Sequence, residues 1–121
     1  MISTEAIDAA LTAHTQWKKR LHDALKTGQS EFQVAVVKRD NACQFGQWLY
    51  GLSQEERNSD ECKKVIELHA EFHKTAAEIL DLALRGKKEE ALTLLQFGGA
   101  YGIVSGRLVL ALQAWKGKVK N

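Results

Sequence analysis

The sequence of 121 residues has no proline, two cysteines and one methionine, and only 7% of it is aromatic. Because proline ends or kinks helices, its absence allows long uninterrupted ones. The two cysteines, Cys43 and Cys62, are too few for a framework of disulfides. A formal net charge of +2 is too small to indicate a nucleic-acid partner. We therefore expect stability to come from a packed core rather than from covalent cross-links.

The sequence also lacks an apolar leader and a long apolar run. Residues 1–5 have neither the basic start nor the apolar stretch of a secretory signal. No later stretch has the roughly 18 uninterrupted apolar residues of a membrane span. A length of 121 residues fits one ordinary domain. We therefore expect a single domain, residues 1–121, that is cytoplasmic and makes no membrane contact.

Apolar residues recur at intervals of three and four through most of the chain, which is typical of amphipathic helices. Three segments show this spacing: residues 3–27, 60–84 and 88–116. Asn41 provides a start signal and Gly51 a stop signal for a short helix between the first two. These patterns predict an all-α fold, an antiparallel four-helix bundle with a short extra helix that carries Cys43.

Two segments allow more than one interpretation. In residues 29–40, Phe32, Val34 and Val36 alternate as in a strand, but the chain offers no second strand to pair with, so we expect an extended or short helical connector. Four glycines fall inside the last predicted helix: Gly98, Gly99, Gly102 and Gly106. Each costs about 1 kcal/mol relative to alanine in a helix interior. They indicate either a break at the first pair or the close approach of another helix.

Four residues have the chemistry of a metal site. His69 and His73 are four apart on a predicted helix, so both imidazoles can point at one ion. His14 falls on the buried face of the first helix, where an imidazole needs a partner. Cys43 lies at the start of the short helix, where backbone N–H groups favour a thiolate. Three imidazoles and one thiolate suit a tetrahedral Zn²⁺, so the sequence predicts a zinc site.

Helix geometry excludes the other histidine and the other cysteine from this site. His22 lies about 12 Å along the helix from His14 and about 80° around it, so one ion cannot reach both. Cys62 lies about 10 Å along its helix from His69, far beyond a zinc–sulfur bond of about 2.3 Å. We expect His22 to be a surface or edge residue and Cys62 to be a buried structural one.

Three separated motifs match the pattern of a known family. They are His14-Thr-Gln-Trp17, Cys43-Gln-Phe-Gly46-Gln-Trp48-Leu-Tyr-Gly51 and His69-Ala-Glu-Phe-His73. With these motifs, in this order, the sequence resembles the chemoreceptor zinc-binding domain family. The resemblance implies the same four zinc ligands, with Trp17, Phe45, Gly46 and Trp48 shaping the site around them. It also implies a homodimer that regulates a chemoreceptor signalling domain or a diguanylate cyclase, in cis or in trans.

A site with four protein ligands favours sensing over catalysis, because it leaves no position for an activated water. We therefore expect no enzyme. Oxidation of Cys43 would weaken its bond to zinc and move the short helix. The resemblance implies that the stimulus is an oxidant such as hypochlorous acid, or zinc itself.

Three alternatives stand beside this interpretation. Zinc can be a purely structural staple of a helix bundle or interaction module. A hydrolytic enzyme would need one of the four ligands to be absent, leaving a position for bound hydroxide. A di-iron protein of the haemerythrin type also uses two histidines four apart, but it needs bridging carboxylates and more histidines than the four here.

Overall fold

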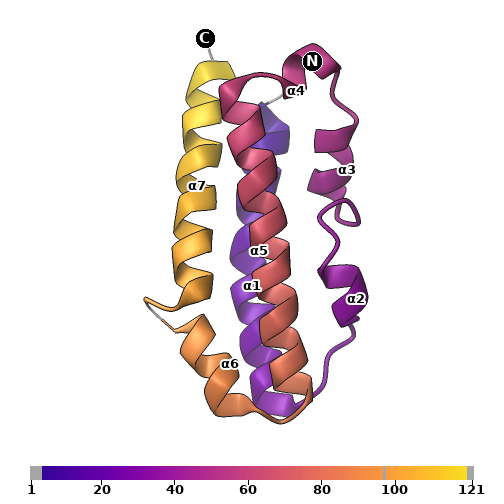
Figure 1. The fold of residues 1–121 in the computed structure, drawn as a ribbon, viewed down its shortest axis with the longest axis vertical. Coiled ribbons are helices and arrows are strands. Elements are labelled where there is room, and N and C mark those ends of the chain that lie inside the picture. The colour runs from indigo at the N-terminus through magenta and orange to yellow at the C-terminus, as the bar shows by residue number, and fades with distance from the viewer. Residues whose placement is uncertain (1–3, 97, 120–121) are drawn as a thin grey trace.

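A computed structural model describes residues 4–96 and 98–119, and all the regular structure in these residues is helical. The three long helices are α1 (Thr4–Thr27), α5 (Asp60–Leu84) and α7 (Ala100–Val119), and they run along the length of the molecule in Figure 1. The all-α class is therefore confirmed for the described part of the chain. The expected start of the first helix at Ser3 lies outside the described residues.

The long helices do not form a simple antiparallel array. Lys116 near the end of α7 makes an ion pair of 2.7 Å with Asp8 near the start of α1, so these two helices are antiparallel. Figure 1 shows that α5 also runs opposite to α7, and α1 and α5 therefore run in the same direction. Residues 28–59, which we call the crossover segment, return along the length of the bundle to join them. For this segment the sequence predicted a connector at residues 29–40 and the short helix that carries Cys43, but not its course along the length of the bundle.

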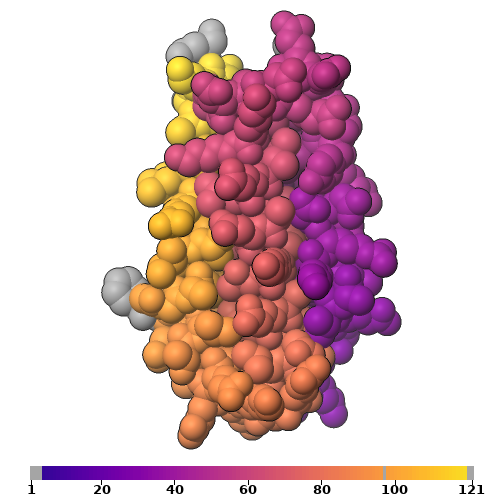
Figure 2. Space-filling view, viewed as in Figure 1, coloured from indigo at the N-terminus to yellow at the C-terminus, as the bar shows by residue number. Residues whose placement is uncertain are grey.

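The crossover segment contains three short helices, α2 (Val34–Val37), α3 (Gln44–Tyr50) and α4 (Gln54–Arg57). Figure 2 shows it packed along the side of α5 opposite to α7. The expected connector at residues 29–40 includes α2. The helix predicted to start at Asn41 begins instead at Gln44, because the side chain of Cys43 accepts the hydrogen bond from Gly46 N–H and acts as its N-cap.

Helix α5 lies at the centre of the bundle, and it packs against α1, α2, α6 and α7. Its buried face is apolar except at two positions, His69 and His73. Apart from Cys62 and Tyr101, the buried polar side chains among the described residues are these two histidines and His14. Their exposed fractions are 4%, 4% and 6%. A buried imidazole needs a hydrogen-bonding or metal partner, and these three histidines line the same cavity.

The helix predicted over residues 88–116 is two helices, α6 (Lys88–Leu95) and α7. Gly98 has a φ of 85°, in the left-handed region that favours glycine. A Cβ on Gly99 would overlap the backbone carbonyl oxygens of Thr93 and Leu94. The first glycine pair therefore makes a break. A Cβ on Gly106 would meet nothing within 4 Å, so no other helix of the described residues approaches closely on that side.

The stretch Lys88–Val119 is long enough, and its mean hydropathy high enough, to cross a membrane. It contains no uninterrupted run of about 18 apolar residues, however. The break between α6 and α7 divides this stretch, and its buried side chains, including Tyr101, Leu108 and Trp115, pack into the bundle. Packed helices of proteins outside membranes pass the same test of length and composition. The stretch is therefore weak evidence for a membrane span.

Candidate metal centre

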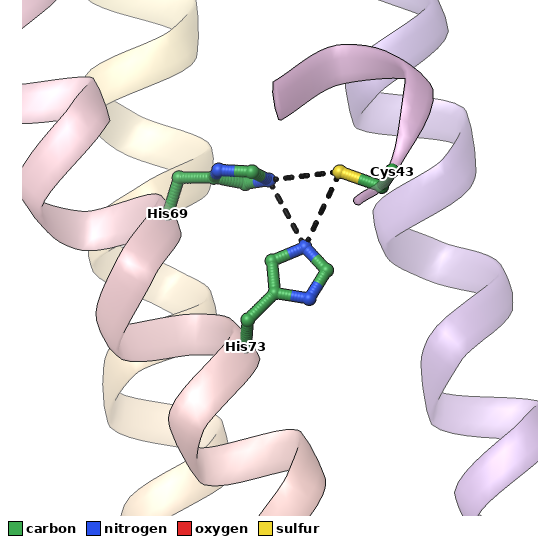
Figure 3. A group of neighbouring side chains, drawn as sticks. All are labelled: Cys43, His69 and His73. Atoms are coloured by element: carbon green, nitrogen blue, oxygen red, sulfur yellow. Dashed lines mark hydrogen bonds between the residues drawn. The ribbon is translucent and has the colours of Figure 1, made fainter. Parts of the chain in front are cut away.

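His69 and His73 project from the buried face of α5 toward one point. They are one turn apart, and their Nε2 atoms lie 3.1 Å from each other. Their rings meet edge to face, with the planes at 82°. Cys43 comes from the crossover segment, and its Sγ lies 3.4 Å from each of the two Nε2 atoms. Figure 3 shows the three side chains converging from α5 and from the start of α3.

The triangle formed by these three atoms fits a zinc ion. With Zn–N bonds of about 2.0–2.1 Å and a Zn–S bond of about 2.3 Å, a tetrahedral site separates two nitrogens by about 3.3 Å and a nitrogen from a sulfur by about 3.6 Å. The observed separations are each about 0.2 Å shorter. One thiol and two imidazoles are also donors that bind zinc in preference to magnesium or calcium. Cys43, His69 and His73 therefore form a cluster able to hold Zn²⁺.

The protonation of the histidines favours metal binding. His73 Nδ1 lies 2.8 Å from the carbonyl oxygen of Val37 in α2, so Nδ1–H donates and Nε2 keeps its lone pair. Burial, and next the nearby His73, lower the pKa of His69 to about 3. Burial also lowers the pKa of His73 and of His14. All three imidazoles are therefore neutral near pH 7, which is the form that coordinates zinc.

The surroundings of the Cys43 side chain disfavour the thiolate, which is the form that binds zinc. Burial raises the pKa of Cys43, while the backbone N–H groups of Gly46 and Phe45 lower it and the charge of Asp40 raises it. The expected help from the helix N-terminus is present, but burial outweighs it. A cation bound at this point would supply the charge that a buried thiolate needs.

Gly46 lets the turn before α3 close tightly around Cys43. A Cβ at this position would overlap the backbone carbonyl oxygen of Asp40. The Asp40 carboxylate accepts a hydrogen bond of 2.5 Å from the Tyr50 hydroxyl, which raises the pKa of Tyr50 to about 12. The turn that presents the thiol is thus tied to the far end of α3.

Aromatic rings surround the cluster. The edge of Phe45 meets His69 with ring centroids 5.2 Å apart, and Phe45 stacks on Trp48 at 5.6 Å. Trp17 of α1 approaches His73 at 6.4 Å. Trp17, Phe45 and Trp48 line the cavity that holds the cluster, so they shape the site as the resemblance implied.

His14 lies in the same cavity but not in the cluster. The cavity has a volume of about 200 Å³, and His14, Cys43, His69 and His73 all line it. The Nε2 atom of His14 makes a hydrogen bond of 2.5 Å to the Ser105 hydroxyl of α7. Its Nδ1 has no hydrogen-bond partner among the described residues. The structure therefore brings together three of the four predicted ligands, and the fourth faces the same space.

The two residues that helix geometry excluded lie elsewhere. His22 is exposed on α1, and Cys62 is fully buried near the start of α5. Three residues that contact the predicted ligands or their turn were not predicted: Val37, Asp40 and Ser105. Each acts through its place in the fold or its backbone carbonyl, for which the sequence pattern holds no signal.

Comparison with known proteins agrees with this geometry. The model of the chemoreceptor zinc-binding domain family matches residues 14–80, more than half of the chain. The chain belongs to this family. The matched span begins at His14 and includes the three clustered side chains, so the chemoreceptor zinc-binding domain holds Zn²⁺. The family is one of zinc-binding signalling domains rather than of known enzymes. Neither the curated proteins nor the solved structures gave a match.

Proposed function

We propose that this chemoreceptor zinc-binding domain is a sensor in which His14, Cys43, His69 and His73 hold one Zn²⁺ and Cys43 receives the stimulus. The observation that supports it best is the double role of Cys43. Its sulfur lies 3.4 Å from two buried imidazole nitrogens and also accepts the Gly46 N–H hydrogen bond that caps α3. A chemical change at one atom therefore affects both the metal site and a helix.

Bound zinc supplies the positive charge that keeps Cys43 as a thiolate. With hypochlorous acid as the oxidant, the thiolate sulfur gives up two electrons and forms a bond to oxygen, and chlorine leaves as chloride. The sulfenic acid is a poorer ligand and a bulkier N-cap than the thiolate. Both of the interactions that hold the start of α3 are then weakened.

Besides the contacts at Cys43, helix α3 is held by a small number of side-chain contacts. It has seven residues, too few for a helix that is stable by itself. Leu49 is fully buried, and Trp48 packs on Trp115 of α7 with ring centroids 5.6 Å apart. Loss of the contacts at Cys43 leaves α3 anchored by these two side chains and by the contact of Phe45 with His69. We expect its N-terminal turn to move away from α5, and this movement is the signal.

Oxidation of the zinc-loaded protein tests the proposal. One equivalent of hypochlorous acid should release zinc to a metal indicator and lower helix content, with mass spectrometry placing the oxygen on Cys43. Cys62→Ala is a matched control, because it removes a fully buried thiol outside the cluster and should respond like the wild type. An unchanged zinc content and helix content after oxidation of Cys43 would refute oxidant sensing.

The closest alternatives are sensing of zinc itself and a structural zinc staple. Zinc sensing is favoured by the raised pKa of Cys43, because proton and metal then compete for the sulfur. The staple is favoured by the link that the cluster makes between α5 and the crossover segment. Cys43→Ala separates the staple from a sensor. It would unfold a stapled bundle at 37 °C but leave a sensor folded and unresponsive.

The family resemblance supports a proposal for the output and the partners. We propose that the domain is a cytoplasmic, non-enzymatic module that modulates chemotaxis or cyclic-di-GMP signalling through a chemoreceptor signalling domain or a diguanylate cyclase, in cis or in trans. We also propose a homodimer. Ile103 and Leu110 on the outer face of α7 are 50% and 67% exposed, and they would be covered by a second copy. Sedimentation of wild type and Leu110→Lys checks this, and a monomeric wild type would exclude it.

A further inference from the structure

His14 is hydrogen-bonded to Ser105, which is not one of the proposed zinc ligands. Its Nε2 atom accepts from or donates to Ser105 Oγ at 2.5 Å, and this bond joins α1 to α7. The His14 ring also packs on Phe72 of α5, with centroids 4.5 Å apart. His14 therefore has a defined position, outside the triangle of the other three donors but along the wall of the same cavity.

The outer ring nitrogen is the one suited to reach the cluster. In His69 and His73 the converging atom is Nε2, which lies farther from the backbone than Nδ1 does. By analogy with these two histidines, Nε2 is the His14 atom that would meet the same ion from the wall of the shared cavity. A nitrogen has one lone pair in the ring plane, and it cannot bind a metal while it is hydrogen-bonded to Ser105. The two partners of His14 Nε2 exclude each other.

We propose that Ser105 competes with zinc for His14, so that completing the coordination shell transfers His14 from α7 to the metal. The proposal rests on the four-ligand site of the proposed function. Cys43, His69 and His73 bind the ion first, because they already converge. Recruitment of His14 then breaks the bond to Ser105 and removes one tie between α1 and α7. Metal occupancy is in this way coupled to the helix whose outer face is most exposed and apolar.

Competition titrations with a chelator measure the effect. Ser105→Ala removes the competing partner, so His14 breaks no hydrogen bond to residue 105 when it moves to the metal. Zinc should therefore bind more tightly. A net hydrogen bond of ordinary strength corresponds to about a two- to tenfold lower Kd. Ser105→Thr keeps the hydroxyl and should keep the wild-type Kd. Thr93→Ala is the matched control, since it removes an exposed hydroxyl on α6 that bonds only its own helix.

A double-mutant comparison tests whether the gain from Ser105→Ala acts through His14, and not through a general change in the fold. In a His14→Ala background, the gain from Ser105→Ala should vanish, because no ligand is left to be released. Cobalt in place of zinc should give the same tetrahedral absorption spectrum in wild type and Ser105→Ala. A different spectrum, or an equal gain without His14, overturns the proposal.

The sign of the effect separates this inference from the proposed function. If His14→Ala leaves the Kd for zinc unchanged, the four-ligand site is wrong. If His14→Ala weakens binding and Ser105→Ala weakens it too, the four-ligand site stands and the competition is wrong. In that case His14 binds through Nδ1 while Ser105 orients its ring from the other side.

Discussion

Replacing Gly46 with alanine tests whether the turn before α3 is what brings the thiol to the histidines. A Cβ at Gly46 would overlap the carbonyl oxygen of Asp40 and lie 2.8 Å from its carbonyl carbon and 3.1 Å from Asn41 Cα. All three atoms belong to backbone, which cannot rotate away as a flexible side chain can. Either this turn or the start of α3 has to retreat, and Cys43 lies between them.

The expected magnitude follows from that overlap. Overpacking against a fixed neighbour costs about 1–3 kcal/mol, and a backbone clash this close belongs at the upper end. Alanine returns about 1 kcal/mol, because it favours the helix more than glycine does. A net loss of about 2 kcal/mol is left, and moving Cys43 out of line is its cheapest relief. That corresponds to about a 30-fold weaker Kd for zinc.

A chelator titration of Gly46→Ala against Gly106→Ala measures this loss. Gly106 also lies in a helix, but it has open space where the Cβ would go. The control should therefore bind zinc normally and gain about 1 kcal/mol in stability. If Gly46→Ala binds zinc as tightly as the wild type, the turn does not position Cys43 and this reasoning is refuted.

Three further predictions concern stability. Burial lowers the pKa of His69 to about 3, so below about pH 6.5 the unfolded chain binds a proton that the metal-free folded domain does not. The stability of the metal-free domain should therefore be full above about pH 6.5. Below that pH it should fall by about 1.4 kcal/mol per pH unit for each such histidine, as urea unfolding would show. Ser59→Ala removes the N-cap of α5 and should cost about 1 kcal/mol, seen as a lower Tm with an unchanged zinc content. The Tyr101 hydroxyl is buried with no hydrogen-bond partner among the described residues, so Tyr101→Phe should raise stability by about 1 kcal/mol, and a lower Tm would show that the hydroxyl is bonded.

The long helices and the histidine pair could be predicted from the sequence, because both depend on local spacing. The apolar pattern predicted both bounds of α5, Asp60 and Leu84, and Ser59 directly before it is the observed N-cap. Two histidines four apart must share a face of any helix, so their convergence needs no knowledge of the fold. Local rules were sufficient wherever the partner lay within the same element.

The errors arose where two local signals competed. Asn41 is a stronger intrinsic N-cap than Cys43, yet the thiol takes that role because Gly46 brings its N–H within 3.3 Å of the sulfur. The break at Gly98 and Gly99 was one of two interpretations, and apolar spacing on both sides concealed it. The direction of α1 relative to α5 depends on the path of the crossover segment, which loop length does not fix. The contact between His14 and Ser105 depends on that same packing.

Because α1 and α5 run in the same direction, a long loop joins them, and a metal bound at Cys43 would shorten that loop. A connection between parallel neighbours has to close a long loop, and the entropy of that closure opposes folding. A bond at Cys43 divides the crossover near its middle and closes a loop of 26 residues to His69. By the measure used for disulfides, a cross-link of this length that persisted in the unfolded chain would restrict it by about 3–4 kcal/mol. Loss of the metal bond at Cys43 would therefore reopen this loop.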